Sequence, residues 1–113
     1  MDYTERLRRL AINDARYTEA GLGGAGVEPR ELEPKTLALV RLAALVAVGG
    51  AVPSYGAHAD AAVSAGATPA EIVDVLVGVV PIVGLPCAVA EAPKLALALG
   101  YDVDDALERQ SGE

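Results

Sequence analysis

His58 is the only histidine in the chain and the first residue whose side chain suggests chemistry. An imidazole with an ordinary pKa of about 6.5 exchanges a proton near neutral pH, which suits general acid or base catalysis. Tyr55 and Ser54 precede it by three and four residues, so in a helix all three side chains share one face. The tyrosine hydroxyl would then donate to a substrate oxyanion, and the serine would hydrogen-bond a ligand. The alternatives are structural: a histidine in a helix interface, a tyrosine at a subunit boundary and a serine that caps a helix.

Two further side chains stand out because of their surroundings. Arg41 is a lone charge in an apolar segment and is a candidate for holding a substrate carboxylate through its planar guanidinium. The alternative is a structural salt bridge, with Glu71, Asp74 or Glu91 as the partner. Cys87 is the single cysteine and follows a proline at an expected helix start, where a thiol pKa falls. It is a candidate redox residue or, alternatively, a small buried apolar group. The chain offers no group of residues that predicts a metal or a cofactor.

The composition limits the classes of function. The 113 residues predict one domain, and they are 52% hydrophobic but only 4% aromatic, with a net charge of −7. No cation lies between Arg41 and Lys94, which disfavours binding to nucleic acid or to an anionic membrane surface. The uncharged stretches 42–57 and 75–90 are 16 residues each, short of the roughly 20 that span a bilayer. The acidic start does not resemble a secretory signal, so we expect a cytoplasmic protein. The high apolar content leads us to expect that the protein buries its excess apolar surface between copies of itself.

The periodicity of apolar residues predicts an all-α fold with about four core helices. Helices are expected over residues 2 to about 20, 34–48, 53–64, 69–80 and 86–99, with a short tail helix over 102–110. Thr68 and Glu71 predict a capping box at the start of the fourth helix. Pro81 is expected to kink that helix, and Pro93 to bend or split the next. The single domain, 1–113, thus divides into an N-terminal helix with a glycine-rich loop (1–26), a core (34–99) and a polar tail (102–113).

Three core segments follow one another in a distinctive order. His58 lies in a helix of small residues that ends at Gly66, the next segment reads Gly-x-Thr-x-x-Glu-Ile over residues 66–72, and Gly84-Leu85-Pro86 follows an apolar helix. This order resembles the carboxymuconolactone decarboxylase family, which includes the alkylhydroperoxidase D-like proteins, over roughly residues 34–99. The resemblance implies an all-helical bundle that assembles into a homotrimer or homohexamer.

The chain departs from the redox branch of that family. Those members carry Cys-x-x-Cys-x-x-x-His, and placing His58 on the motif histidine puts Ala51 and Ser54 at the cysteine positions. Neither side chain forms a thiolate, so two-cysteine alkylhydroperoxidase activity is not expected. The glutamate that relays protons one helix earlier in that branch has no counterpart over residues 37–40. Of the redox site, only the histidine is kept.

Three functions remain open from the sequence. The first is a carboxy-lyase or a related lyase or isomerase that acts on or binds a small carboxylated lactone or carbonyl compound. In it, His58 is the acid/base, while Tyr55, Arg41 and Ser54 contact the substrate. The second is a non-catalytic oligomeric binding or scaffold member of the family. The third is a peroxiredoxin-like peroxidase that uses Cys87 alone.

Overall fold

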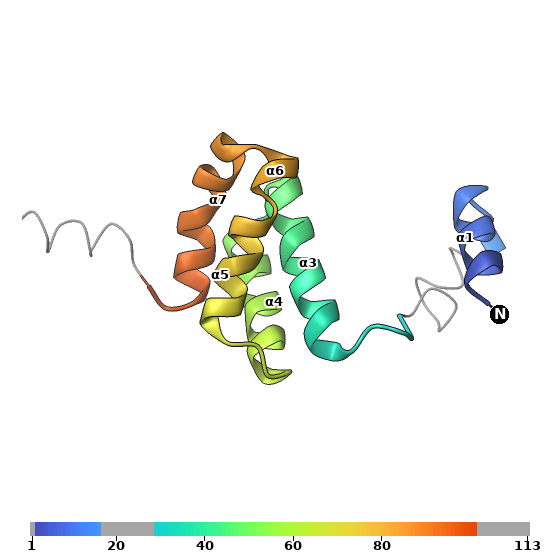
Figure 1. Cartoon of the computed structure of the whole chain (residues 1–113), viewed down its shortest axis with the longest axis horizontal. Helices are drawn as coiled ribbons and strands as arrows, with labels where there is room; N and C mark the ends of the chain where they lie inside the picture. Colours follow the sequence, from blue (N-terminus) through green and yellow to red (C-terminus); the bar gives the residue numbers. More distant parts are fainter. Residues whose placement is uncertain (1, 17–28, 102–113) are drawn as a thin grey trace, which may run out of the picture. The chain divides into compact units, whose positions relative to one another are not determined.

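The structure, a computed structural model, describes residues 2–16 and 29–101, and the regular elements of this part are all helices, without a strand (Figure 1). The all-α prediction is therefore confirmed for the described residues. The chain divides into two units, residues 1–32 and 33–113. The glycine-rich loop over 21–26 and the tail helix over 102–110 lie outside the described residues.

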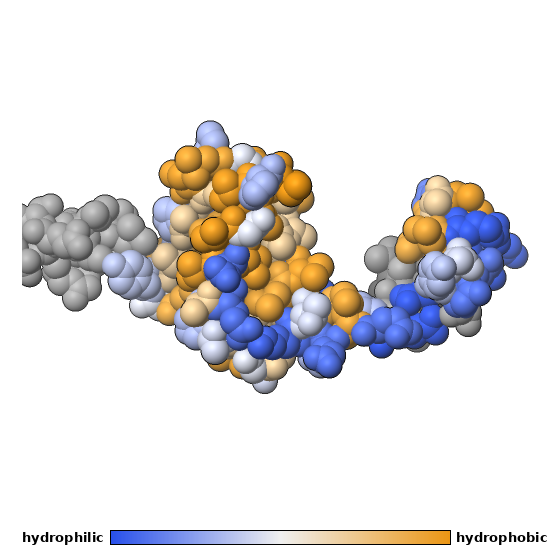
Figure 2. Space-filling view, viewed as in Figure 1, coloured by the Kyte–Doolittle hydropathy of each residue, from blue (hydrophilic) through white to orange (hydrophobic). Residues whose placement is uncertain are grey.

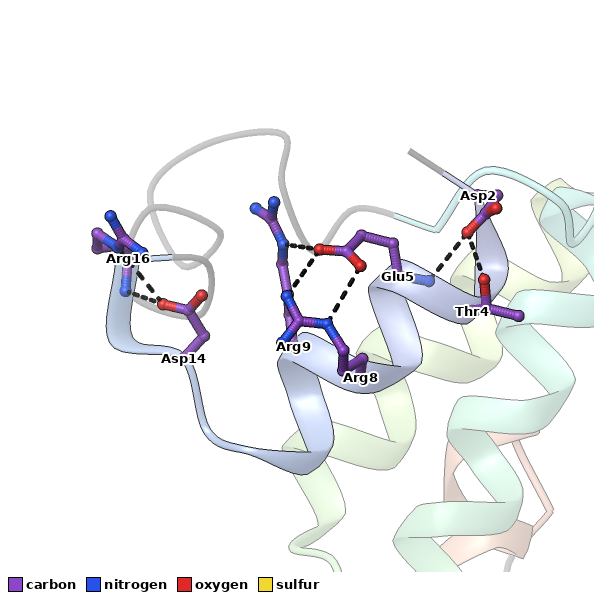
Figure 3. A network of polar contacts seen from close by, with 7 residues as sticks. All are labelled: Asp2, Thr4, Glu5, Arg8, Arg9, Asp14 and Arg16. Carbon is purple, nitrogen blue, oxygen red and sulfur yellow. Dashed lines mark hydrogen bonds and ion pairs between the residues drawn. The ribbon is translucent and has the colours of Figure 1, made fainter.

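The first unit contains α1 (Tyr3–Ala11). The carboxylate of Asp2 caps it by accepting a hydrogen bond of 2.9 Å from the backbone N–H of Glu5. The Glu5 carboxylate lies 3.0 Å from the guanidinium of Arg8 and 2.9 Å from that of Arg9 (Figure 3). Hydrogen bonds from these two arginines lower the pKa of Glu5 to about 2. The interleaved charges thus bind one another along the helix surface.

The predicted helix over residues 2 to about 20 is wrong in its extent. α1 ends at Ala11, and Asn13 has a φ of 54°, a left-handed conformation that interrupts a helix. No residue of α1 is buried, and Leu7 and Leu10 of its apolar stripe are exposed.

The second unit packs five helices: α3 (Pro34–Val48), α4 (Val52–Ser64), α5 (Pro69–Gly78), α6 (Val80–Val83) and α7 (Leu85–Ala98). α4 lies against α3 and α7, and α5 packs mainly on α3 (Figure 1). The largest fully buried side chains are Leu42, Val46, Tyr55 and Ile72. Buried alanines fill the spaces between them, which allows the helix backbones to approach closely.

Local signals in the sequence account for most helix ends. α3 ends at Gly49, whose φ of 77° lies in the left-handed region that favours glycine. The predicted capping box of Thr68 and Glu71 is confirmed at the start of α5. Near Pro81 the chain breaks into α5 and α6, where a kink in one helix was expected. Pro93 lies inside an uninterrupted α7, so the predicted split does not occur there.

Among the described residues, none of the helices combines the length and the apolar character that crossing a bilayer requires. Apolar side chains nevertheless cover much of the face of the helical unit shown in Figure 2. Ile82, for example, is 87% exposed. The second unit therefore has a small core and a large apolar surface.

Candidate functional site

The start of α4 carries Ser54 and Tyr55. Ala51 is the N-cap residue, and no side chain caps the helix. The expectation that Ser54 caps this helix is therefore wrong: it is the third helical residue, and its N–H donates to the carbonyl of Ala51 at 3.0 Å. Proline at the second position suits a helix start, because its missing N–H would have no partner there.

Tyr55 points into the core and not to solvent. Its side chain is fully buried, and its hydroxyl donates a hydrogen bond of 2.7 Å to Oε1 of Glu91 in α7. Glu91 is 5% exposed and is the buried charged residue of the described core. The hydroxyl that was expected to meet a substrate oxyanion is thus bonded to a buried carboxylate.

Lys94 completes this cluster from the next turn of α7. Its ammonium donates to Oε2 of Glu91 at 3.0 Å and to the carbonyl of Gly50 at 3.1 Å. Gly50 lies in the turn between α3 and α4. The polar cluster, which we define as Tyr55, Glu91, Lys94 and Gly50, therefore ties α7 to the first turn of α4 and to the residue before its cap.

Two pKa values in the polar cluster follow from these contacts. Burial raises the pKa of Glu91, but hydrogen bonds from Tyr55 and Lys94 and the lysine charge outweigh burial, so the pKa is lowered overall. Burial, together with the bond to Glu91, raises the pKa of Tyr55. At neutral pH the cluster holds an ionised carboxylate between a neutral phenol and an ammonium.

His58 lies on α4 three residues after Tyr55 and is half-buried. Within the described part of the chain its imidazole forms no hydrogen bond and no ion pair. The structure therefore does not join His58 to Tyr55, whose hydroxyl is directed at Glu91. It leaves the imidazole partly accessible and its two nitrogens available to a ligand.

Arg41 is exposed on α3 and forms no ion pair with any described residue. Two of its expected partners have other cations: Lys35 lies 2.7 Å from Glu71, and Lys94 lies 3.0 Å from Glu91. The structural salt bridge expected for Arg41 is therefore not formed with either glutamate. The guanidinium avoids the cost of burial by reaching solvent.

Cys87 is the third residue of α7 and is half-buried. Its Sγ donates a hydrogen bond of 3.3 Å to the carbonyl of Val46 in α3. A thiol that donates is protonated, and the thiolate, which is the nucleophilic form, would lose this bond. The contact suits a structural cysteine between two helices.

Sequence reasoning missed Glu91 and Lys94 as members of a site. Glu91 entered only as a partner for Arg41, and Lys94 only as the end of a stretch without cations. The available signal was their spacing, because an acid and a base three residues apart in an otherwise apolar helix form a pair that can be buried together.

Over residues 2–16 and 29–101, no three His, Cys, Asp or Glu side chains come together as potential metal ligands. The chemistry that these residues offer is proton exchange and hydrogen bonding. The candidate site has two parts. One is the half-buried imidazole on α4, and the other is the buried polar cluster at the start of the same helix.

The helical unit and its site can now be compared with known proteins. A family model described as the carboxymuconolactone decarboxylase family matches residues 14–97. The match covers more than half of the chain, and the chain belongs to this family. The comparison with curated proteins and the comparison with solved structures found no match.

Proposed function

We propose that the protein acts on or binds a small carboxylated lactone or carbonyl compound, with His58 as the acid/base. The observation that carries this proposal is the state of the imidazole: half-buried on α4, and without a hydrogen-bonding partner among the described residues. Both ring nitrogens can therefore bond to a ligand without giving up a bond to a described residue. Family membership supports the same reading at a coarser level.

The proposed reaction is a decarboxylation. The bond between the substrate and its carboxyl carbon breaks, carbon dioxide leaves, and the electron pair passes into a neighbouring carbonyl as an enolate. The imidazolium of His58 then gives a proton to the carbon that lost the carboxyl group, and the imidazole regains a proton from solvent. A histidine suits this step because both of its protonation states are populated near neutral pH.

Ser54 is the substrate-contacting residue of this proposal, and Arg41 is the cation that the sequence offers for the substrate carboxylate. Arg41 is exposed and can offer its donors to a carboxylate, and Ser54 is half-buried in the first turn of α4. Tyr55 contributes in a different way from the one expected, because its hydroxyl is bonded to Glu91. We assign it a positioning role in the first turn of the helix that carries His58.

The test is turnover by His58 variants. A panel of small lactones and keto acids that bear a carboxylate is incubated with the protein, and release of carbon dioxide is followed. His58→Gln is expected to lower kcat at least about 100-fold, as loss of a general acid or base does. Asp60→Asn, at an exposed position of the same helix, is the matched control and should retain the rate. Equal rates for His58→Gln and the unsubstituted protein would refute the acid/base role.

A second candidate is a non-catalytic oligomeric binding protein. An apolar groove of about 200 Å³ supports it, lined entirely by Leu76, Val77, Val80, Leu85, Ala88, Val89 and Ala92 from α5, α6 and α7. Such a groove without polar groups can be covered by the same surface of a second copy. Absence of turnover across the panel, combined with a trimeric or hexameric mass by light scattering, would favour this candidate. A monomer at micromolar concentration would contradict the homo-oligomer.

A further inference from the structure

Lys94 is a second candidate site for an anion among the described residues, besides Arg41. We propose that Lys94, and not Arg41, holds the carboxylate of the substrate, with Glu91 and Gly50 fixing its ammonium in place. The inference rests on the proposed function, because it assumes a carboxylated ligand. It adds a binding residue that the sequence pattern did not single out.

The argument begins with the cations available. The described residues of the helical unit contain three of them, Lys35, Arg41 and Lys94. Lys35 pairs with Glu71 at 2.7 Å near the start of α5. Arg41 is exposed and is not fixed by any described partner, so binding a ligand would require ordering of its long side chain.

Lys94 differs because two acceptors already fix its ammonium. One is Oε2 of the buried Glu91, at 3.0 Å, and the other is the main-chain carbonyl of Gly50, at 3.1 Å. A lysine ammonium has three donors, so one N–H remains without a described acceptor. The side chain is 36% exposed, which leaves that donor accessible to a ligand. A donor that is ordered before binding loses less entropy when the ligand arrives.

Glu91 occupies only one of the donors of Lys94. Glu91 is stabilised by Tyr55 as well, since the phenol donates to its other oxygen at 2.7 Å. Oε1 of Glu91 is thus bonded to the phenol and Oε2 to Lys94, so the carboxylate uses one of the three N–H donors of Lys94.

The position of Lys94 relative to α4 completes the argument. Gly50, whose carbonyl it contacts, immediately precedes the N-cap residue Ala51. The first turn of α4 then carries Ser54, and the next carries His58. A carboxylate bound at Lys94 would thus lie beside the start of the helix that supplies the proposed acid/base.

The direct test uses the fact that the chain contains only two lysines. The protein is labelled with carbon-13 at lysine, and acetate is titrated at constant ionic strength while both side-chain signals are followed by NMR. Acetate should shift the Lys94 signal saturably and leave Lys35 unchanged, and acetamide, the neutral isostere, should shift neither. Lys35 is the matched control because it is also ion-paired and similarly exposed, at 38%.

Equal shifts of both lysines would overturn the proposal, since they would show only general attraction of anions. Loss of the Lys94 response in Arg41→Met would also overturn it, by assigning the carboxylate to Arg41. The titration needs no turnover, so it separates this proposal from the role of His58. A saturable Lys94 response in His58→Gln would support the binding site even if the acid/base role failed.

Turnover gives an independent readout. Lys94→Met alone would leave Glu91 as an unpaired buried charge, so the informative variant is the double substitution Glu91→Gln with Lys94→Met. It should raise KM about tenfold or more, the contribution of one charge-assisted hydrogen bond, with a smaller change in kcat. Lys94→Arg should keep most of the affinity because it keeps the charge. Unchanged KM in the double variant would refute the proposal.

Discussion

The hydroxyl of Tyr55 donates to Oε1 of Glu91 at 2.7 Å, although 36 positions separate the two residues in the chain. This bond joins α4 to α7 through the interior of the helical unit. It satisfies two buried polar groups at once, and in the described structure no buried side-chain nitrogen or oxygen lacks a partner. The buried carboxylate of Glu91, with its phenol and ammonium partners, thus forms a specific connection between helices in an otherwise aliphatic core.

Removing the hydroxyl tests the strength of this connection. Tyr55→Phe should destabilise the protein by about 1–3 kcal/mol, because Oε1 of Glu91 would remain buried without its donor. The free energy of unfolding is measured by urea denaturation. Tyr101→Phe is the control, since Tyr101 is exposed and its substitution should change stability little. Equal effects of the two substitutions would contradict the assigned role of the bond.

The fold was predictable where local sequence determines it, and the polar cluster was not. Glycine after α3 and the Thr68 capping box are short-range signals, and the structure confirms the helix ends that they predicted. The partner of Tyr55 depends on how α7 packs against α4, which periodicity does not specify. For the same reason the sequence left open whether Arg41 holds a carboxylate or forms a salt bridge, and the structure places its side chain in solvent.

Acid should weaken the polar cluster. The pKa of Glu91 is lowered in the folded protein, so its ionised form contributes stability that is fully present above the pKa of the unfolded chain. This contribution is lost as the pH falls through the lower folded pKa. The stability difference between the unsubstituted protein and Glu91→Gln should therefore be constant above about pH 6 and shrink below about pH 4.5.

Denaturation curves at several pH values measure this difference. Glu71→Gln is a useful comparison, because Glu71 also has a lowered pKa but lies nearer the surface. Its effect should be smaller at every pH, since exposed pairs contribute little. A difference for Glu91→Gln that stays the same down to pH 3 would show that the carboxylate is not held in its ionised form by the cluster.

Cys87 should behave as a structural thiol. Its Sγ donates to the carbonyl of Val46, and the side chain is half-buried between α7 and α3. We expect slow labelling by a thiol reagent in the folded protein and fast labelling in denaturant, because the nucleophilic thiolate would lose this bond. Consumption of added peroxide should be equal for the unsubstituted protein and for Cys87→Ser. Faster consumption of peroxide by the unsubstituted protein than by Cys87→Ser would contradict this and would support a peroxidase that uses Cys87 alone.

The start of α5 depends on the capping box. The backbone N–H of Glu71 donates to Oγ1 of Thr68 at 3.1 Å, and Oε1 of Glu71 accepts from the N–H of Thr68 at 3.0 Å. Thr68→Ala should cost about 1 kcal/mol of unfolding free energy, because two backbone N–H groups at a helix start depend on this pair of side chains. Thr36→Ala is the matched control: Thr36 is exposed inside α3, where alanine favours the helix, so stability should stay the same or rise slightly. A loss in Thr36→Ala as large as that in Thr68→Ala would mean that the cap itself contributes nothing.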